Sequence, residues 1–569
     1  MEKKRLSKSR YTLLCQCPKA LWLRTYKPDE AEVDEGLEAR FEQGNVVGDL
    51  AMQLFGNFKE VTVKNEDGSL DLSKMIELTQ QYMDEGVENI CEASFSYEQE
   101  HRVENITKIN TDEPFVKNWK ESHYCAVDIL RKEKGGWAIY EVKSTSFPMF
   151  NEKQTKLEKY APDIAYQKWV LDHCGINVTG TYLVCLNSDY VREGDLDLKQ
   201  LFVIKDMKEL VENEYLKVAH RAKQAMKVIN DENEPDTDLS EHCNKPYHCG
   251  FFDYCKRQHG IPQPSVFDVY GGKGRGGFTF AKKLACYQAG QLSFEDLRSL
   301  SIGNIQNIQI EAALTGREFI NPAGIRSFLD KLSYPLYFLD FETIQDVIPH
   351  YDGAKPYQQI TFQYSLHIKE SETASYTHKE FLSPNDGSDP RRSLAEQLCK
   401  DIPEDVCTLA YNKMFECGRI KELADLYPDL ADHLLNIREH IVDLIDPFRA
   451  GDYYVPAMGG SFSIKSVLPA LFPNDPELDY HNLSELCQNG GDAMTIFPKL
   501  TEMQKQLPKQ GIQVMKDGRL VLSDSLMKLS DLCAILNEID AGRKALLRYC
   551  ELDTWAMVKV WEKLKEVAE

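Results

Sequence analysis

Alternating apolar and polar residues over 124–145, YCAVDILRKEKGGWAIYEVKST, predict two β-strands joined by a tight turn. The turn falls on residues 134–136, where two glycines tolerate positive φ angles. Because alternate residues of a strand share a face, Glu141 and Lys143 project to the same side of the second strand. We expect this hairpin to bring both side chains close to Asp128 of the first strand.

Hydrophobic patterns elsewhere predict further elements on both sides of a helical connector. Strand patterns lie at 181–187, 335–343 and 359–368. Longer helical patterns lie at 163–171, 206–228 and 549–556. Short helical patterns with glycine or proline stops lie at 277–289, 293–299, 305–315 and 322–331. These elements predict an α/β protein with domains at 1–262 and 333–569 and a helical connector at 263–332.

Length and charge narrow the classes of function. At 569 residues the chain is too long for one hydrophobic core, so two or three domains are expected. The 67 basic and 90 acidic residues give a net charge of −23, which argues against a general nucleic-acid coat. An enzyme that holds a polymer in one local channel fits this charge. The basic start lacks an apolar signal region, and no run of about 18 apolar residues follows, so we expect a cytoplasmic protein without a membrane partner.

The hairpin carries a candidate metal site. A facing Asp128 and Glu141 repel each other unless a cation neutralises them, and hard ions such as Mg²⁺ or Mn²⁺ prefer oxygen ligands. A metal-activated water beside Lys143, which can offset charge on a phosphate oxygen, would support phosphodiester hydrolysis. The simpler interpretation is an exposed hairpin with an ordinary cross-strand ion pair.

The cysteines suggest a second kind of site. Most of the sixteen lie in apolar stretches and are typical of small core residues. Cys243, Cys249 and Cys255 instead recur at intervals of six residues, with proline and glycine between them. Either Cys17, which precedes a proline, or Cys15 can supply a fourth thiolate. Four thiolates suit zinc or an iron–sulfur cluster, and structural cysteines without a metal are the third possibility.

The amino-terminal motifs resemble a known nuclease family over about residues 1–260. The C-P-K-A-L-W-L motif, the D…E-V-K hairpin, a glutamine-bearing helix and three closing cysteines are similar to RecB-type PD-(D/E)xK nucleases with an iron–sulfur cluster. Examples of this type are CRISPR-associated RecB-like exonucleases and the AddB nuclease domain. The resemblance implies a restriction-endonuclease-like fold, Asp128 and Glu141 as metal ligands, and Lys143 as the catalytic lysine. It also implies a structural [4Fe–4S] cluster with four ligands, namely Cys17, Cys243, Cys249 and Cys255.

Further residues extend this resemblance, and one departs from it. Gln167 matches the glutamine of the family's Q-x-x-x-Y helix, although the tyrosine position holds Leu171. Glu92 precedes the hairpin as the family's accessory carboxylate does. Gly48 stands where the family often has a metal-binding histidine. Either Asp49 or Glu92 takes its place, or the first metal is held less tightly.

The carboxy-terminal half contains three motifs in a fixed order. Asp340 and Glu342 form D-x-E on one face of a buried strand, and Glu416 ends an N-x-x-F-E motif. Tyr549 and Asp553 are i,i+4 neighbours on the last helix. Residues 333–569 thereby resemble the DEDD superfamily of 3′→5′ exonucleases with an RNase H-like fold.

This second resemblance implies two metal ions held among four carboxylates, Asp340, Glu342, Glu416 and Asp553. Tyr549 would position the attacking water, and Lys465, in S-F-S-I-K, would contact a phosphate. The family usually has aspartate where this chain has Glu416, and the extra methylene can displace the second metal.

The predicted function is a Mg²⁺- or Mn²⁺-dependent nuclease with two active sites acting on DNA or RNA ends, in repair or in defence against foreign nucleic acid. The pairing of the two halves also resembles an uncharacterised bacterial family. A non-catalytic binding protein with degraded sites is one alternative, favoured by Gly48 and Glu416. A redox enzyme is another, but the glycines at 271–277 follow no convincing strand, as a nucleotide loop would require.

Overall fold

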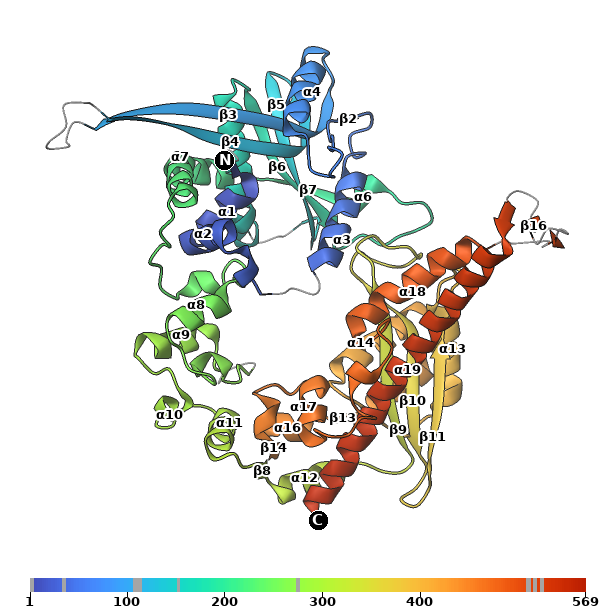
Figure 1. The fold of residues 1–569 in the computed structure, drawn as a ribbon. Helices are drawn as coiled ribbons and strands as arrows, with labels where there is room; N and C mark the ends of the chain where they lie inside the picture. Colours follow the sequence, from blue (N-terminus) through green and yellow to red (C-terminus); the bar gives the residue numbers. More distant parts are fainter. Residues whose placement is uncertain are drawn as a thin grey trace. The chain divides into compact units, whose positions relative to one another are not determined.

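The computed structural model describes residues 5–32, 37–105, 115–150, 154–272, 277–507, 513–514, 519–521 and 526–569. It is a mixed α/β structure (Figure 1). The chain divides into two compact units, the first formed by 1–261 with 347–356 and the second by 262–346 with 357–569. The segment expected as a connector, 263–332, therefore lies within the second unit. Residues 347–356 belong to the first unit, where the Asp352 Oδ1 accepts the Gly194 N–H at 2.8 Å.

The first unit is built on a mixed sheet in the order β2-β3-β4-β5-β6-β7, with β1 paired to β4. Its strands are β1 (Leu6–Ser7), β2 (Lys59–Glu60), β3 (Asn89–Asn105), β4 (Phe115–Glu133), β5 (Gly136–Phe147), β6 (Val178–Asn187) and β7 (Phe202–Asp206). Strands β3, β4 and β5 are antiparallel neighbours, whereas β6 runs parallel to β5. The hairpin predicted at 124–145 is confirmed as β4 and β5.

This sheet forks where the candidate site residues lie. The ladder between β4 and β5 ends at the pair Ile129 and Tyr140. Beyond that point β5 continues along β6, and β4 pairs with the short parallel strand β1. The Val142 N–H, which faces the opening fork, donates to Asp128 Oδ2 at 2.7 Å. A side chain thus satisfies a backbone group that the ladder no longer pairs.

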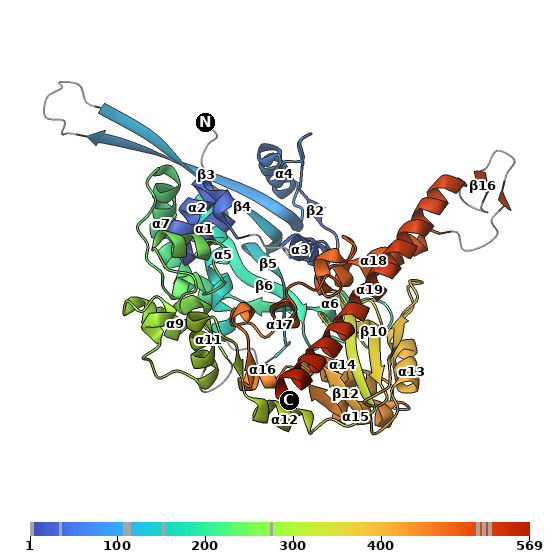
Figure 2. The ribbon, with the colours of Figure 1, turned by 60° about the horizontal axis from the view of Figure 1, so that its bottom comes forward.

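Helices pack against this sheet around one hydrophobic core (Figure 2). The helices of the first unit are α1 (Lys8–Gln16), α2 (Pro18–Tyr26), α3 (Leu37–Ala51), α4 (Leu72–Asp84), α5 (Ala161–His173), α6 (Leu198–Leu201), α7 (Lys208–Asn230) and α8 (Phe252–Gln258). Helix α5 lies between α1, α7 and the sheet. Although α7 is rich in lysine and glutamate, it buries Val211, Val218 and Ala222 on one face, as an amphipathic helix does.

The second unit contains a five-stranded sheet in the order β11-β10-β9-β12-β13. Its strands are β9 (Leu336–Gln345), β10 (Gln359–Lys369), β11 (Tyr376–Leu382), β12 (Cys407–Ala410) and β13 (Ile441–Asp443). Strand β9 is antiparallel to β10 and parallel to β12. Shorter strands are β8 (Phe319–Ile320), β14 (Tyr453–Tyr454), β15 (Gln513–Val514), β16 (Arg519–Val521) and β17 (Leu526–Lys528).

Helices cover both faces of this second sheet. Helices α13 and α14 contact β10, and α18 and α19 contact β9. The helices of the second unit are α9 (Phe280–Gln288), α10 (Phe294–Leu297), α11 (Asn304–Thr315), α12 (Pro322–Leu329), α13 (Arg391–Asp401), α14 (Met414–Leu426), α15 (Ala431–Glu439), α16 (Asp446–Ala450), α17 (Ile464–Leu471), α18 (Gly490–Lys505) and α19 (Leu529–Ala568). The four short helical segments predicted before residue 332 are confirmed as α9 to α12. The long helix α19 lies across β9 and β10 (Figure 1).

The alternation of β9 determines where its carboxylates point. Leu336 and Phe338 join a core cluster with α19, whereas Tyr337 and Leu339 join a cluster with α13, α14 and α15. Asp340 continues the first series, so it and Glu342, two residues on, project toward α19. The strand period thereby delivers both carboxylates to the last helix, as the sequence predicts.

Within the part of the chain that the structure describes, none of the helices combines the length and the apolar character needed to cross a bilayer.

Candidate metal centres

The fork of the first sheet assembles four residues predicted from the sequence. Asp128 comes from β4, Glu141 and Lys143 from β5, and Gln167 from α5. The Lys143 ammonium donates to Glu141 Oε1 at 2.5 Å, and the Gln167 amide donates to Glu141 Oε2 at 2.6 Å. Glu141 and Gln167 are fully buried. The fork therefore holds a buried carboxylate between a lysine and a glutamine.

Two residues of this cluster were missed by the sequence analysis. Asp163 lies one helical turn before Gln167, and its Oδ2 accepts from the Lys143 ammonium at 2.9 Å. Its i,i+4 spacing from Gln167 is a signal that could have found it. Lys8 begins α1, and its ammonium lies 3.0 and 3.1 Å from the two Glu141 oxygens and 3.3 Å from Asp128 Oδ1. Nothing in the local sequence marks Lys8, because β1 carries it to the fork from far along the chain.

Glu92 also belongs to this cluster. It lies in β3 between the pairs that Cys91 and Ala93 make with β4, and it has a φ of 56°. A glutamate in the left-handed region is uncommon and costs on the order of 1–3 kcal/mol. Burial, followed by the charge of Asp128, raises the pKa of Glu92 to about 7. The strained backbone thus holds a fourth carboxyl group, after Asp128, Glu141 and Asp163, close to the fork.

The residues considered in place of the missing histidine, Asp49 and Glu92, lie in different surroundings. Gly48 lies in α3, and a Cβ built there would meet no atom within 4 Å. Asp49 is exposed on the same helix. Of the two replacements suggested by the sequence, Glu92 is the one on which the charges of Asp128 and Glu141 act.

Carboxyl groups outnumber ammonium groups at this fork. Burial and then Glu141 raise the pKa of Asp128 to about 6. Burial would also raise the pKa of Glu141, but Lys143 and Lys8 outweigh it and hold that pKa well below its ordinary value. The Gln167 Oε1 is buried and has no hydrogen-bond partner among the described residues. Hard oxygen ligands and excess negative charge suit a divalent cation, although the Lys8 ammonium now lies between Asp128 and Glu141.

The cysteine site lies in the same unit. The thiols of Cys17, Cys243, Cys249 and Cys255 line one small cavity. Burial raises the pKa of all four, to about 11 for Cys243 and about 12 for Cys255. Cys15 lies elsewhere, with its sulfur 3.7 Å from Arg221 Nη1. The cavity therefore selects Cys17 over Cys15 as the fourth member.

The spacing of these sulfurs bears on which metal group fits. A tetrahedral zinc site with Zn–S bonds of about 2.3 Å places its sulfurs about 3.8 Å apart. Among the described residues, no three of the four thiols have sulfurs within 4.8 Å of one another. The described thiols therefore stand farther apart than the ligands of a bound zinc ion.

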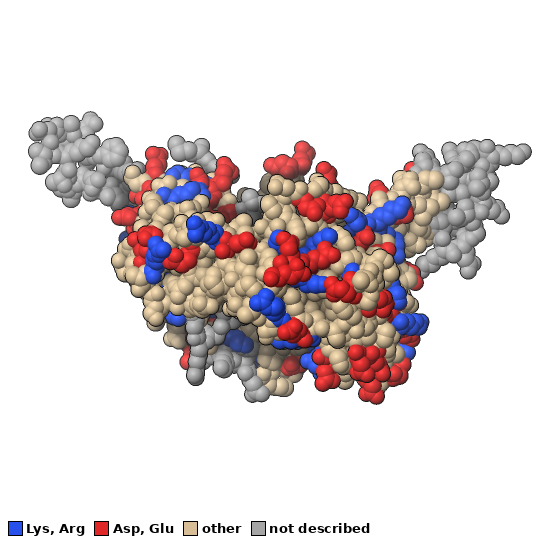
Figure 3. All heavy atoms as spheres, turned by 90° about the horizontal axis from the view of Figure 1, so that it is seen from below, with Lys and Arg blue, Asp and Glu red and all other residues tan. Residues whose placement is uncertain are grey.

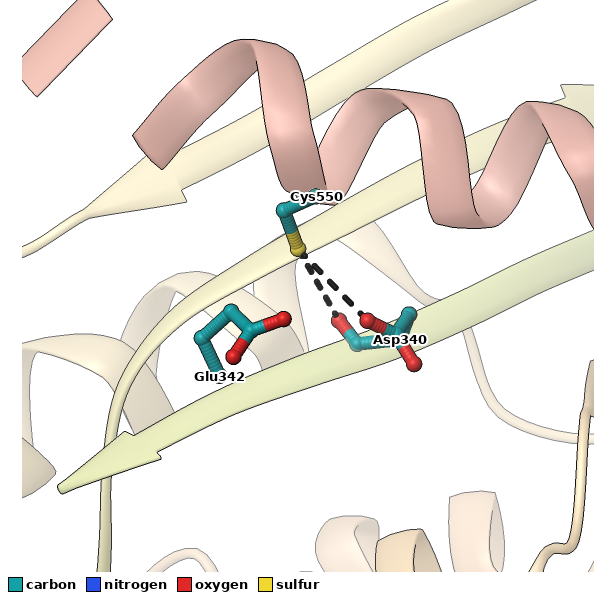
Figure 4. A group of neighbouring side chains, drawn as sticks. All are labelled: Asp340, Glu342 and Cys550. Carbon is teal, nitrogen blue, oxygen red and sulfur yellow. Dashed lines mark hydrogen bonds between the residues drawn. The ribbon is translucent and has the colours of Figure 1, made fainter. Parts of the chain in front are cut away.

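The second unit brings another group of ligand atoms together. Asp340 and Glu342 on β9 and Cys550 on α19 each place one ligand atom within 4.8 Å of the others (Figure 4). The Cys550 thiol donates to Asp340 Oδ2 at 3.8 Å and to the Asp340 carbonyl oxygen at 3.9 Å. Burial, followed by the other carboxylates, raises the pKa values of Asp340 and Glu342 well above their ordinary range. The sequence analysis did not single out Cys550, although it lies next to Tyr549.

The other predicted residues on this side surround the same group. Asp553 Oδ1 accepts from the Tyr480 hydroxyl at 2.5 Å, and Tyr549 also donates to this carboxylate. The Lys465 ammonium lies 5.7 Å from the ring centroids of both Tyr480 and Tyr549. Its charge lowers the pKa of Glu342 and of Asp553, against the effect of burial. Tyr480 was not predicted.

Glu416 stands apart from the ligand group. It lies in the first turn of α14 and is 2% exposed, and burial raises its pKa to about 8. Asp443 sets the start of that helix by accepting the backbone N–H groups of Asn412 and Lys413 at 2.8 and 3.1 Å. The charge of Glu416 reaches Asp340 and Glu342, but its carboxylate is outside the group of three.

Part of the second unit is similar to proteins of unknown function. Residues 337–463 match the family described as "Domain of unknown function (DUF2779)", a stretch that includes Asp340, Glu342 and Glu416. The chain is also 27% identical over 182 residues to the uncharacterised protein UU173 of Ureaplasma parvum serovar 3. That alignment covers 29% of this chain and 25% of the relative, so the chain matches a quarter of the relative's length. No solved structure matches the chain.

Replacing Lys8 by methionine tests the charge balance at the fork. Its loss leaves Asp128 and Glu141 buried with less compensation, so in a chelator we expect the free energy of unfolding to fall by about 3 kcal/mol. Mn²⁺ should recover much of that loss, because an ion can take the place of the ammonium group. Urea denaturation with and without Mn²⁺ measures both effects.

Lys74→Met is the matched control, because Lys74 forms an exposed ion pair with Glu77 at 2.9 Å. It should change the free energy of unfolding by no more than about 0.5 kcal/mol. Equal effects of the two substitutions would contradict a special role for Lys8.

Proposed function

We propose that the protein is a metal-dependent nuclease with one catalytic centre in each unit, acting on the ends of DNA or RNA. The observation that carries this proposal is the convergence of Asp128, Glu141, Lys143 and Gln167 at the fork between β4 and β5. These residues come from two strands and a helix. Asp128, Glu141 and Lys143 match the PD-(D/E)xK motif in type and in order, and Gln167 matches the glutamine of the family's Q-x-x-x-Y helix.

The sheet topologies support the two fold assignments. In the first unit the carboxylates lie on an antiparallel hairpin whose second strand continues into a parallel pair, as expected for a restriction-endonuclease-like core. In the second unit the first strand, β9, is central, and the order β11-β10-β9-β12-β13 is the one expected for an RNase H-like sheet. The D-x-E pair lies on β9 and faces the final helix, as a DEDD exonuclease would require.

Each residue has a role in this proposal. In the first unit Asp128 and Glu141 would hold Mg²⁺ or Mn²⁺, and Gln167 and Asp163 orient Glu141 and Lys143. Lys143 is placed to orient water or offset charge on a phosphate oxygen. The bound ion would supply Lewis acidity and a water of lowered pKa.

In the second unit Asp340, Glu342 and Asp553 would hold the metal, while Tyr549 orients water and Lys465 contacts a phosphate. Glu416 would join them only through a shift of the α14 start, because its carboxylate stands outside the ligand group. This offset, and the absence of a histidine at position 48, are the features that favour the alternative of a non-catalytic nucleic-acid-binding protein.

A groove in the first unit supports nucleic acid as the substrate. It has a volume of about 1130 Å³ and reaches from the loop beside Cys249 to Thr145 and Pro162, which neighbour Lys143 and Asp163. Five basic side chains and three glutamates line it, namely Arg24, Lys156, Lys159, Arg221, Lys245, Glu32, Glu158 and Glu214. Basic and acidic side chains are interspersed on the face shown in Figure 3. A locally basic groove in a chain of net charge −23 suits a polymer held in one channel.

We further propose that Cys17, Cys243, Cys249 and Cys255 hold a structural [4Fe–4S] cluster. The common cavity and the separation of its sulfurs support this choice over zinc. Cys17 lies between the first two helices, and the other three lie in and around α8, so the cluster would join the two ends of the first unit.

None of the sixteen cysteines forms a disulfide, which favours a reducing compartment such as the cytoplasm. The redox-enzyme alternative has little support, and its glycine segment at 271–277 lies partly outside the described residues.

Cleavage assays with two variants test the two centres. Lys143→Ala should lower cleavage by the first centre, and Asp340→Asn should lower 3′→5′ trimming by the second, each by at least about a hundredfold, because each removes a group that positions water or binds metal. End-labelled single- and double-stranded DNA and RNA with Mg²⁺ or Mn²⁺ provide the measurement.

A 3′-blocked substrate separates the activities, since only the second centre requires a free 3′ end. The exposed residues Lys134 and Asp330 provide the controls Lys134→Ala and Asp330→Asn, which should cleave as the unaltered chain does. If Lys143→Ala and Asp340→Asn together left every product unchanged, neither unit would be a nuclease.

Visible absorption tests the cluster. Anaerobically purified protein should be brown, because thiolate-to-iron charge transfer absorbs visible light, whereas zinc has a filled d shell. Cys17→Ser and Cys249→Ser should lose the colour and stability of the first unit, while Cys15→Ser should keep both. A colourless protein with stoichiometric zinc would exclude the iron–sulfur assignment.

A further inference from the structure

The Cys550 side chain is directed at two carboxylates rather than at apolar neighbours alone. It is fully buried on α19, and its sulfur lies 3.8 Å from Asp340 Oδ2 (Figure 4). The sulfur and one oxygen from each of Asp340 and Glu342 lie within 4.8 Å of one another. Three ligand atoms from two elements therefore converge on one point.

A second observation indicates that this point binds a cation. Glu342 is 7% exposed, and its carboxylate accepts no hydrogen bond from any residue that the structure describes. Figure 4 shows this carboxylate turned toward Cys550 and Asp340. A buried carboxylate without a partner is costly unless it is protonated or bound to a cation. Lys465 acts on it only through its charge.

Asp553 is less available than these residues as a ligand for an ion at this point. The Tyr480 hydroxyl donates to its Oδ1 at 2.5 Å, and Tyr549 donates to the same carboxylate. Cys487 is also buried near Glu342 and Asp553, but its sulfur is outside the group of three. The described atoms that meet at one point are thus two carboxylate oxygens and a single sulfur.

We propose that Asp340, Glu342 and Cys550 form a mixed oxygen and sulfur site for a thiophilic divalent transition metal of the Zn²⁺ class. This inference rests on the proposed function in that it names the metal class of the second centre. Binding would replace the S–H bond of Cys550 by a metal–sulfur bond and release the proton to solvent. Thiolate ligands favour zinc and similar ions, whereas Mg²⁺ requires near-octahedral oxygen coordination, to which a sulfur contributes nothing.

Cadmium NMR of the full chain tests this site directly, with ¹¹³Cd²⁺ alone as the probe. The ¹¹³Cd chemical shift depends on how many sulfurs bind the ion, so a site with one sulfur is resolved from the four-cysteine site and from sites with oxygen ligands only. The unaltered protein should show a one-sulfur resonance. Cys550→Ser should lose it or move it to the oxygen-only range.

Cys407→Ser is the matched control, because Cys407 is a buried cysteine of β12 in the same unit. It should keep the one-sulfur resonance, and near-ultraviolet circular dichroism establishes that both variants are folded. Competition titrations add a second readout, in which Cys550→Ser should lower the preference for Zn²⁺ over Mg²⁺ by at least about tenfold. An oxygen-only resonance that Cys550→Ser leaves unchanged, or no resonance from this unit at all, would overturn the proposal.

The ¹¹³Cd resonance and the trimming assay together distinguish failure of this inference from failure of the proposed function. A one-sulfur resonance that Asp340→Asn abolishes, in a protein without 3′→5′ trimming, would retain the metal site and reject the nuclease. Trimming that depends on Asp340 but is accompanied by an oxygen-only resonance would retain the nuclease and reject the sulfur ligand.

Discussion

Burial of like charges is the constraint on which both candidate centres depend. At the fork of the first sheet, Lys8 and Lys143 offset part of the charge of a larger set of buried carboxyl groups. In the second unit, Lys465 is the lysine whose charge reaches Glu342 and Asp553. Carboxyl groups in such surroundings either hold protons or bind cations. The raised pKa values of these carboxyl groups correspond to proton binding, and the proposed metal sites correspond to cation binding.

Each sheet creates its cluster by a different device. In the first unit two strands separate, and the gap admits side chains from α1 and α5 that no continuous ladder could accommodate. In the second unit β9 stays paired with β10 through Asp340 and Glu342, although its ladder with β12 ends at Phe338, and the strand period of two presents both carboxylates to α19. A movement of helix α1 would therefore change the contacts at the fork. The contacts of the second cluster depend instead on a strand and a helix that pack in one core.

Residues that follow strand or helix periodicity could be predicted from the sequence. The hairpin placed Glu141 and Lys143 on one side, and the D-x-E pair required only the alternation of a buried strand. Asp163 could have been found in the same way from its spacing to Gln167. In these cases the local repeat determines which side chains meet, so a single sequence contains the information.

Residues whose position depends on tertiary packing could not be predicted. Lys8 reaches the fork because β1 pairs with β4, a contact between distant segments. The choice of Cys17 over Cys15 depends on which thiol faces a cavity formed by residues more than two hundred positions away. Glu416 was expected among the ligands, but Asp443 fixes the helix start that carries it. The assignment of 347–356 to the first unit had no local signal.

Anomalous diffraction from crystals grown with Mn²⁺ tests the central claim most directly, because it locates bound ions without reference to activity. We predict one anomalous peak between Asp128 and Glu141, with the Lys8 side chain displaced. An ordered fork that binds no manganese, with Lys8 still in contact with both carboxylates, would contradict this prediction.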